Sequence, residues 1–249
     1  MRERMKKITV AIMASLSLWA ATNAFAENVT LNTIEQSQLN EIVTMLEGNP
    51  ELIPNLHQGI KAYIDQQQQV DQVLAQNHDY LYNNPKHPQF GSANPKLTIV
   101  NFTDYSCPFC KKLDPVLHQA ALAYPDVKVV NVLVPLIEMR NPLSDKNSAA
   151  FAINVWNQDR DKFYDVNETL IKKPSAHDNR SVTNVAKKFG IEASLQTSEE
   201  TQKMIEKNYQ LFTELGLRGT PAMIIGDHIV PGYVPMEELK KLIDQALQS

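Results

Sequence analysis

Residues 97–110 read LTIVNFTDYSCPFC, and they carry the most informative pattern in this sequence of 249 residues. The first six residues, 97–102, are mostly apolar and β-branched, which is typical of a buried strand. After a short turn come two cysteines at Cys-x-x-Cys spacing, Cys107 and Cys110. They open the stretch 107–124, in which apolar residues recur at helical spacing. The pattern predicts a strand that leads directly into a helix with two cysteines in its first turn.

The surrounding sequence predicts an α/β domain. A second apolar, β-branched run at 127–134 completes a strand–helix–strand unit, and such a unit implies a parallel pair of strands. Further strands are expected at 222–225 and 228–230, with a closing helix at 236–247. Between the two groups of strands, helices are expected near 145–158, 160–172, 181–190 and 198–215.

The cysteine pair predicts redox chemistry. A thiol at a helix N-terminus feels about half a positive charge and unpaired backbone N–H groups, and both favour the reactive thiolate. Cys107 is nearest the helix end and is expected to be exposed, whereas Cys110 lies one turn further in and can resolve a disulfide. Pro108 suits the first turn, where its missing N–H is not needed. A stabilised Cys107 thiolate stabilises the reduced form, which makes the pair a stronger oxidant.

Two other interpretations of the cysteine pair remain. It could be half of a zinc site, but the sequence holds no second pair, and its histidines are scattered. It could also be a static disulfide, although so short a loop gains little from cross-linking. The position at a strand-to-helix junction favours redox activity over both, and no metal site is predicted.

Composition excludes several classes of protein. A formal net charge of −4 gives no basic surface for nucleic acid, and two cysteines cannot build a disulfide-rich scaffold or a four-thiolate zinc site. No apolar run reaches the roughly 18 residues that a membrane-spanning helix needs.

Residues 1–26 have the three parts of a secretory signal. Four basic residues lie within 2–7, an uncharged stretch covers 8–21, and the small-x-small triplet at 24–26 reads Ala-Phe-Ala. The alternative is a short membrane anchor. A cleaved signal predicts an exported protein, with a mature chain that begins at Glu27 and folds where disulfides persist.

Residues 27–75 are predicted to form a helical arm. Two apolar stripes at helical spacing are separated by Gly48-Asn49-Pro50, and a Gln-rich run follows at 66–69. Thin amphipathic helices cannot bury their apolar faces alone, so they pack on the core domain or pair with another copy. Residues 76–96 are predicted to be a linker, because 83–96 holds three prolines and a glycine. A boundary there favours oligomerisation.

A second motif, Gly219-Thr220-Pro221-Ala222, lies directly before a predicted strand. Proline can enter a strand only at its first residue. A cis Thr220–Pro221 bond would leave backbone groups free to pair with an extended peptide. Alone the motif also fits an ordinary turn, but its position along the chain, after the cysteine helix, makes it a stronger signal for a cis-proline loop.

Residues 102–112, FTDYSCPFCKK, followed by Gly219-Thr220-Pro221-Ala222, resemble the DsbA-type thiol–disulfide oxidoreductases of the thioredoxin superfamily. The resemblance covers about 90–249. It implies a thioredoxin fold at 97–249 with a helical insertion at about 140–215. It also implies that Cys107 is the nucleophile, that Cys110 is the buried resolving thiol, and that Thr220 and Pro221 form a substrate-binding cis-proline loop. The arm resembles the N-terminal oligomerisation segment of dimeric or trimeric members.

The sequence departs from the family pattern at three positions. Asn101 stands where a buried acid is common, so Asp104 is the nearest substitute as proton acceptor, with a turn or capping role as its alternative. Phe109 stands where strongly oxidising members have histidine, which implies a less oxidising pair. The equal alternative is that Phe109 is only an apolar contact for substrate. Thr220 before the proline resembles the isomerases, which are also dimers.

The sequence thus predicts a periplasmic protein that forms or isomerises disulfide bonds in unfolded exported proteins through Cys107-Pro108-Phe109-Cys110. The resemblance implies a membrane redox partner, a homodimer with a trimer as the alternative, and no cofactor beyond the Cys107–Cys110 disulfide. Association with the outer membrane stays open. The rival is a non-catalytic exported chaperone, adhesin or copper-binding protein on the same scaffold, since Cu(I) favours soft sulfur ligands.

Overall fold

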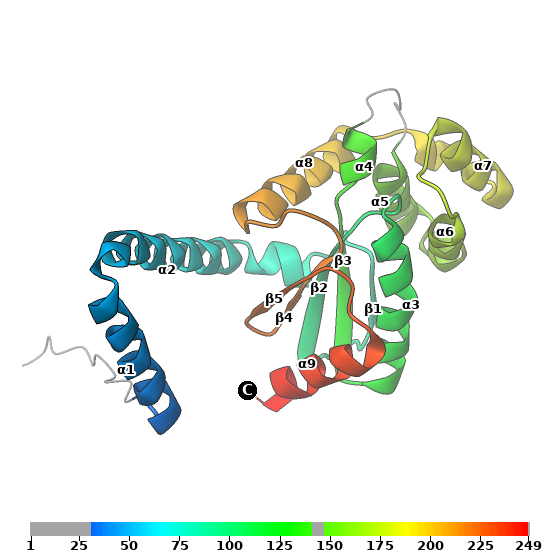
Figure 1. Ribbon diagram of the computed structural model, residues 1–249. Coiled ribbons are helices and arrows are strands. Elements are labelled where there is room, and N and C mark those ends of the chain that lie inside the picture. Colours follow the sequence, from blue (N-terminus) through cyan, green and yellow to red (C-terminus); the bar gives the residue numbers. More distant parts are fainter. Residues whose placement is uncertain (1–30, 141–146, 249) are drawn as a thin grey trace, which may run out of the picture. The chain divides into compact units, whose positions relative to one another are not determined.

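A mixed five-stranded sheet carries the cysteine motif. The computed structural model describes residues 31–140 and 147–248 (Figure 1), so the predicted signal segment at 1–26 lies outside the described residues. The strands lie in the order β1-β3-β2-β4-β5, and only β2 and β3 pair in parallel. Their bounds are β1 (Gln89–Gly91), β2 (Leu97–Thr103), β3 (Val127–Leu133), β4 (Ala222–Ile225) and β5 (His228–Pro231).

The predicted strand–helix–strand unit is confirmed to within one residue at each boundary. It consists of β2, α3 (Pro108–Ala123) and β3. The register pairs Leu97 with Val127 and continues to Thr103 opposite Leu133. Both strands are buried along nearly their whole length, because helices cover both faces of a sheet with a parallel pair at its centre.

One face of the sheet packs against α3 and α9 (Met236–Gln248). Alternate strand residues such as Ile99, Val129 and Met223 point to this face and meet Leu117 and Ile243 of the two helices. The predicted closing helix and the predicted hairpin of β4 and β5 are therefore confirmed. The hairpin turns at a glycine, residue 226, whose positive φ of 56° suits a residue without a Cβ atom.

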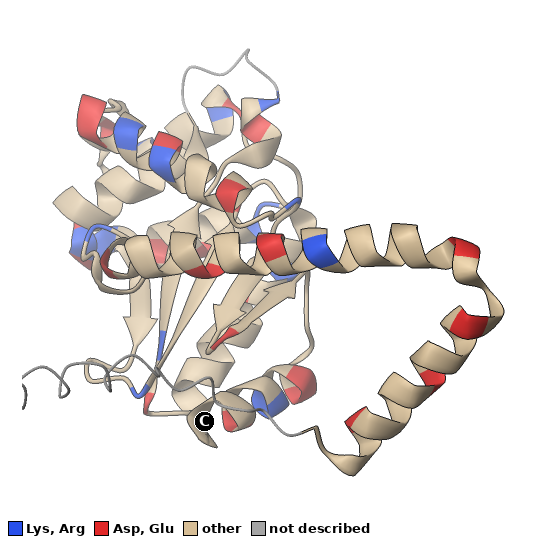
Figure 2. Ribbon diagram, turned by 90° about the vertical axis from the view of Figure 1, so that its left-hand side faces the viewer, with Lys and Arg blue, Asp and Glu red and all other residues tan. Residues whose placement is uncertain are grey.

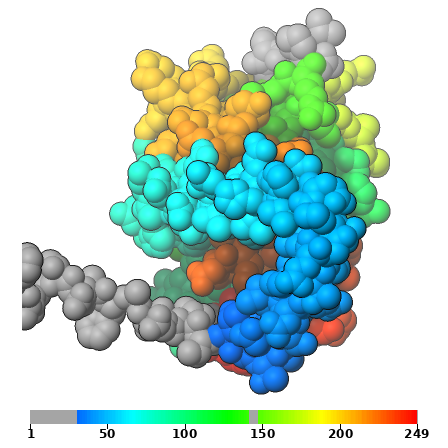
Figure 3. Space-filling view, turned by 60° about the vertical axis from the view of Figure 1, so that its left-hand side comes forward, coloured from blue at the N-terminus to red at the C-terminus, as the bar shows by residue number. Residues whose placement is uncertain are grey.

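The other face packs against α8 (Glu199–Glu214) and the C-terminal part of α2 (Ile53–Gln76). Val70 near the end of α2 belongs to the same apolar cluster as Phe102 of β2 and Leu211 of α8. In Figure 3 the end of α2, in cyan, lies beside α8, in gold to orange. The described residues form two compact units that divide between Ala62 and Tyr63.

This division differs from the predicted boundaries at 75 and 96. The end of α2 and the predicted linker belong to the unit that holds the sheet, because their apolar side chains complete the cover of its second face. The linker itself contains a single turn of π-helix at Asp79–Asn83, where Leu81 is fully buried.

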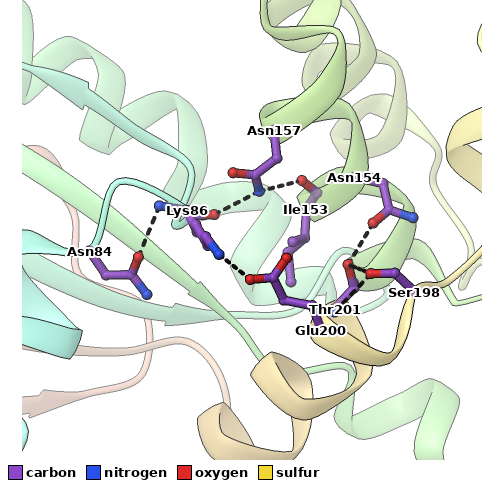
Figure 4. A network of polar contacts seen from close by, with 8 residues as sticks. All are labelled: Asn84, Lys86, Ile153, Asn154, Asn157, Ser198, Glu200 and Thr201. Atoms are coloured by element: carbon purple, nitrogen blue, oxygen red, sulfur yellow. Dashed lines mark hydrogen bonds and ion pairs between the residues drawn. The ribbon is translucent and has the colours of Figure 1, made fainter.

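Polar contacts also fix the proline-rich segment to the helical insertion (Figure 4). The side chain of Asn157 donates to the carbonyl oxygen of Lys86 at 3.2 Å, and the ammonium of Lys86 pairs with the carboxylate of Glu200. The indole N–H of Trp156 donates to the carbonyl oxygen of Pro85 at 2.8 Å. The proline-rich segment is therefore an ordered part of the domain surface and not a free linker.

Strand β1 was not predicted. It has only three residues, too few for an alternating pattern, and it pairs antiparallel with β3 at the edge of the sheet. Gly91 ends it with a φ of 97°, and a Cβ atom there would lie 2.4 Å from the carbonyl oxygen of Val127. A residue without a Cβ atom is needed here, because the backbones of β1 and β3 approach each other closely at Gly91.

The helical insertion between β3 and β4 has its own core. Its elements are α4 (Leu136–Met139), α5 (Ser148–Gln158), α6 (Arg160–Lys172), α7 (Asn179–Phe189), a 3₁₀ turn at Glu192–Leu195, and α8. Residues 148–156 of α5 are all buried, so this helix forms the centre of the insertion. The four predicted helices are confirmed, with starts set by the capping side chains of Asn147, Asp178 and Ser198.

The arm consists of α1 (Thr33–Gly48), a 3₁₀ turn at Pro50–Leu52 and the N-terminal part of α2. The predicted break between its helices is confirmed. Asn32 caps α1 by accepting hydrogen bonds from the backbone N–H groups of Ile34 and Glu35. Over the described part of the chain, every helix is too short or too polar to cross a membrane.

Candidate active site

Cys107 occupies the N-cap of α3, and Pro108 is the first helical residue. The Cys107 N–H donates to the carbonyl oxygen of Asp104 at 3.0 Å, which closes the turn from β2 into the helix. The Cys107 carbonyl oxygen accepts from the N–H of Lys111 at 3.2 Å, the first hydrogen bond of the helix. The Cys107 side chain therefore lies beside the unpaired N–H groups and the positive end of the helix dipole.

The two sulfur atoms lie in different surroundings. Both cysteines are free thiols, and Cys110 is buried as expected. Cys107 was expected to be exposed, and that prediction is wrong, since only 6% of the residue is accessible. The reason is a loop distant in sequence: the Cys107 sulfur lies 3.1 Å from the carbonyl oxygen of Thr220, to which the protonated thiol donates. The bond between Thr220 and Pro221 is cis.

The environment makes Cys107 acidic. A hydrogen bond from the Cys110 side chain is the largest cause that lowers the pKa of Cys107 from its ordinary 9.0 to about 5. The backbone N–H groups of Cys110 and Phe109 and the side chain of Thr220 act in the same direction, against the effect of burial. For Cys110, burial first and the neighbouring Cys107 second raise the pKa far above its ordinary value. The site therefore holds one thiolate and one thiol at neutral pH.

Asp104 lies under the active-site turn and is almost fully buried. Its carboxylate accepts from the N–H of Ser106 at 2.8 Å and from the N–H of Ile137 at 3.0 Å. Burial raises the pKa of Asp104 to about 6 despite these hydrogen bonds. Its own N–H donates to the Cys110 sulfur at 3.4 Å. Asp104 thus contacts Cys110 through its backbone and supports the turn through its side chain.

Asn101 forms a neutral pair at the position where a buried acid was considered. Its side-chain N–H donates to the side-chain oxygen of Asn131 at 2.8 Å across the parallel strands. The side-chain oxygen of Asn101 is buried without a hydrogen-bond partner among the described residues. Both side chains are amides, so this pair carries no titrating group.

Phe109 and the cis-proline loop give the site its outer surface. The Phe109 side chain is exposed, at 56%, and the Lys112 ammonium lies 5.5 Å from its ring centroid. Thr220 and Pro221 line a pocket of about 430 Å³ together with Ile229. An exposed aromatic ring at Phe109 and a mostly apolar pocket at the cis-proline loop can contact an unfolded chain.

The structure adds residues that the sequence analysis did not single out. Ser106, directly before the nucleophile, hydrogen-bonds to the carboxylate of Glu138 at 2.8 Å and to the backbone N–H of His177 at 2.9 Å. Glu138 is the lone acid in the otherwise apolar stretch 132–139, and an isolated acid of this kind is a signal that could have been noticed. The structure thus connects the helical insertion to the active-site turn.

The described residues do not bring three or more His, Cys, Asp or Glu side chains together in a group suited to a metal ion. The cysteine pair and Asp104 instead lie together at the start of α3. The cis-proline loop, which precedes β4, contacts Cys107 there through the carbonyl oxygen of Thr220. This arrangement is suited to sulfur chemistry, because it places a stabilised thiolate and a second, buried thiol in the same turn.

Comparisons with known proteins agree with this geometry. The family model described as Thioredoxin matches residues 83–245. Disulfide bond formation protein D of Bacillus subtilis is 25% identical over 175 residues, which cover 65% of this chain and 77% of that protein.

Solved structures give the same result. Proteus mirabilis ScsC in a transitional conformation is 31% identical, with a TM-score of 0.64, over 88% of this chain and 99% of that one. A periplasmic thioredoxin-like protein from Salmonella enterica serovar Typhimurium is 36% identical, with a TM-score of 0.61, over 69% of this chain and 96% of that one. The chain belongs to the thioredoxin family, and within it to the DsbA-like thiol–disulfide oxidoreductases.

Proposed function

We propose that this protein is a periplasmic oxidoreductase that forms or isomerises disulfide bonds in exported proteins, with Cys107-Pro108-Phe109-Cys110 as its active site. One observation carries the proposal: the Cys107 sulfur lies at the start of α3, next to the thiol of Cys110 and under the carbonyl oxygen of Thr220. The secretory pattern at 1–26 supports the proposed location, as does the printed description of the Salmonella protein as periplasmic.

The reaction passes through a mixed disulfide on Cys107. In oxidation, a substrate thiolate attacks Cys107 of the oxidised pair, Cys110 leaves, and a second substrate thiolate then releases Cys107. The substrate gains a disulfide, the enzyme keeps two thiols, and a membrane redox partner re-oxidises the pair. In isomerisation, the Cys107 thiolate attacks a substrate disulfide, and a substrate thiol resolves the intermediate.

Four further residues have proposed roles around this exchange. Thr220 and Pro221 bind the substrate backbone beside the sulfur, and Phe109 contacts its apolar side chains. Asp104, whose raised pKa of about 6 lies near neutral pH, accepts the proton that Cys110 loses when it resolves a mixed disulfide. No diffusible cofactor is required, because the electrons pass between sulfur atoms.

Equilibration with glutathione tests the proposal directly. We expect a potential between about −120 and −270 mV for the Cys107–Cys110 pair, the range of known exchange catalysts. The absence of a histidine at Phe109 moves the value away from the most oxidising end. The measurement is the fraction of reduced protein in glutathione buffers, read by alkylation and mass spectrometry. A potential below about −300 mV would mark an inert structural bridge and contradict the proposal.

A non-catalytic chaperone, adhesin or copper-binding protein is the rival hypothesis. Prevention of aggregation that survives the loss of Cys107 would favour a chaperone or adhesin. Stoichiometric Cu(I) binding that requires both thiols would favour a copper carrier. The stabilised thiolate favours exchange, because a chaperone surface has no use for an acidic thiol.

We also propose that the arm pairs copies of this chain into a homodimer, with a trimer as the alternative. The apolar side chains of α1 and early α2 are largely exposed: Ile34, Leu39, Ile42, Val43, Met45, Ile53, Leu56 and Ile60. Figure 2 shows acidic residues at intervals along both helices, and Lys61 is the single lysine or arginine in them. Charge pairing between arms is therefore weak, and burial of the apolar stripe would drive association.

A charge placed on the apolar stripe is expected to dissociate the oligomer. Ile42→Asp puts one carboxylate in the middle of the stripe of α1, where association would bury it without a partner. The control Asn40→Asp adds the same charge to the opposite side of this helix and should leave the mass unchanged. Light scattering after gel filtration measures the mass. A wild-type monomer, or equal masses for both variants, would contradict the pairing.

A further inference from the structure

Ser106, the residue before the nucleophile, is held on three sides. Its backbone N–H donates to the Asp104 carboxylate at 2.8 Å, and its hydroxyl donates to Glu138 Oε1 at 2.8 Å. The same hydroxyl accepts from the backbone N–H of His177 at 2.9 Å. Ser106 is only 3% exposed, so water cannot take the place of these partners.

Glu138 makes the other half of this connection. It belongs to the short helix α4 and is 7% exposed. Besides Ser106, its carboxylate accepts from the N–H of Ser148 at 2.8 Å and from the hydroxyl of Ser148. A buried carboxylate needs such partners, and those of Glu138 come from the active-site turn and from the first residue of α5.

We propose that Glu138 is a positioning residue for disulfide exchange: through the hydroxyl of Ser106 it fixes the turn that places the Cys107 sulfur at the start of α3. This inference rests on the proposed function of the cysteine pair. Among the described residues, the hydrogen bonds of Glu138 go to Ser106 and Ser148 and not to either sulfur atom. Glu138 therefore anchors the turn to the helical insertion. The insertion thereby takes part in setting the reactivity of the site.

The effect on redox equilibrium follows from what stabilises the thiolate. The N–H groups of Phe109 and Cys110 act on the Cys107 sulfur only while it is held in place at the helix terminus. In the oxidised protein this sulfur is uncharged and bound to Cys110, so it gains little from those donors. Loosening the turn therefore costs the reduced form more than the disulfide form, and the pair becomes less oxidising.

Three variants of the full chain separate positioning from charge and from stability. Glu138→Ala removes the acceptor for Ser106. Glu138→Gln removes the charge but keeps the shape, and its amide can satisfy the same serines because hydroxyl groups both donate and accept. Ser148→Ala removes a partner of Glu138 and leaves its hydrogen bond to Ser106 in place.

The measurement is the equilibrium constant with glutathione for each variant, with denaturant unfolding of the reduced and oxidised forms. We expect Glu138→Ala to shift the constant at least about fivefold towards the disulfide, because the Cys107 thiolate loses part of the stabilisation that the helix terminus gives it. Glu138→Gln and Ser148→Ala should stay within about twofold of wild type. If Glu138→Ala does not fold, Ser106→Ala breaks the same link and should shift the constant in the same direction.

Several outcomes overturn the inference. A Glu138→Ala protein that unfolds more easily but keeps the wild-type constant would assign Glu138 to stability alone, because a loss shared by both redox forms cancels in the constant. Equal shifts of Glu138→Ala and Glu138→Gln towards the dithiol would assign its effect to charge. A wild-type protein without a measurable glutathione equilibrium would instead refute the proposed function, so the two failures are distinct.

Discussion

Replacing Cys107 with serine is expected to abolish thiol–disulfide exchange, with a loss of at least about a thousandfold, because a hydroxyl forms no disulfide and is not a nucleophile at its ordinary pKa. The Cys107 sulfur is the one that the helix terminus and the Cys110 thiol stabilise as a thiolate. Reduction of a model disulfide substrate and oxidative refolding of a reduced one both measure the loss. Retained turnover in Cys107→Ser would place the chemistry elsewhere.

Cys110→Ser is the matched control, since it also replaces a sulfur atom with oxygen, one turn further along α3. This variant keeps the nucleophile but lacks the resolving thiol, so substrates should accumulate as mixed disulfides on Cys107. Mass spectrometry under non-reducing conditions should find one adduct per chain, and a reductant should release it. Adducts on Cys110 in the Cys107→Ser protein would reverse the assignment of nucleophile and resolving thiol.

The titration of Cys107 is the second prediction with a large effect. The environment lowers its pKa from 9.0 to about 5, so ultraviolet absorbance of the thiolate should show a midpoint near pH 5 in the reduced protein. The rate of Cys107 alkylation should then change little from pH 6 to 8, whereas an ordinary thiol becomes steadily more reactive over that range. A midpoint near the ordinary value would contradict the geometry at the start of α3.

Substitutions at Cys110 test the cause of this shift. Its side chain is the largest contributor to the low pKa of Cys107, so Cys110→Ala should raise the midpoint. Cys110→Ser keeps a hydrogen-bond donor at the same place, and its midpoint should lie closer to that of the wild type. Midpoints equal to that of the wild type in both variants would mean that the Cys110 side chain does not stabilise the thiolate.

The same shift fixes the sign of the pH dependence of stability. The pKa of folded Cys107 lies below its ordinary value, so ionisation stabilises the folded reduced protein fully above pH 9, and this contribution is lost as the pH falls through about 5. Asp104 acts in the opposite sense, because its raised pKa of about 6 favours folding at lower pH. Both redox forms hold Asp104, and below the ordinary thiol pKa of 9.0 Cys110 stays protonated. In that range the difference between the unfolding free energies of the two redox forms therefore reports mainly on Cys107.

Much of the sheet could be predicted because its signals are local. The strand at 97–102, the helix that follows Cys107 and the strand at 127–134 each carry their own apolar period, and the structure reproduces them to within one residue. Strand β1 has only three residues and is defined by pairing with β3, which no local pattern reveals. The division between Ala62 and Tyr63 depends on which helices cover the second face of the sheet.

The sequence by itself determined where the two thiols lie in the fold: a Cys-x-x-Cys pair at a strand-to-helix junction places one sulfur at a helix terminus, because neighbours in the chain are neighbours in space. Only the tertiary structure decided how far that sulfur is exposed to solvent and which contacts hold the turn that carries it. Thr220 reaches Cys107 across 113 positions, and Glu138 reaches Ser106 across 32. Such contacts arise from packing of the sheet and the helical insertion, and no periodicity in the chain encodes them.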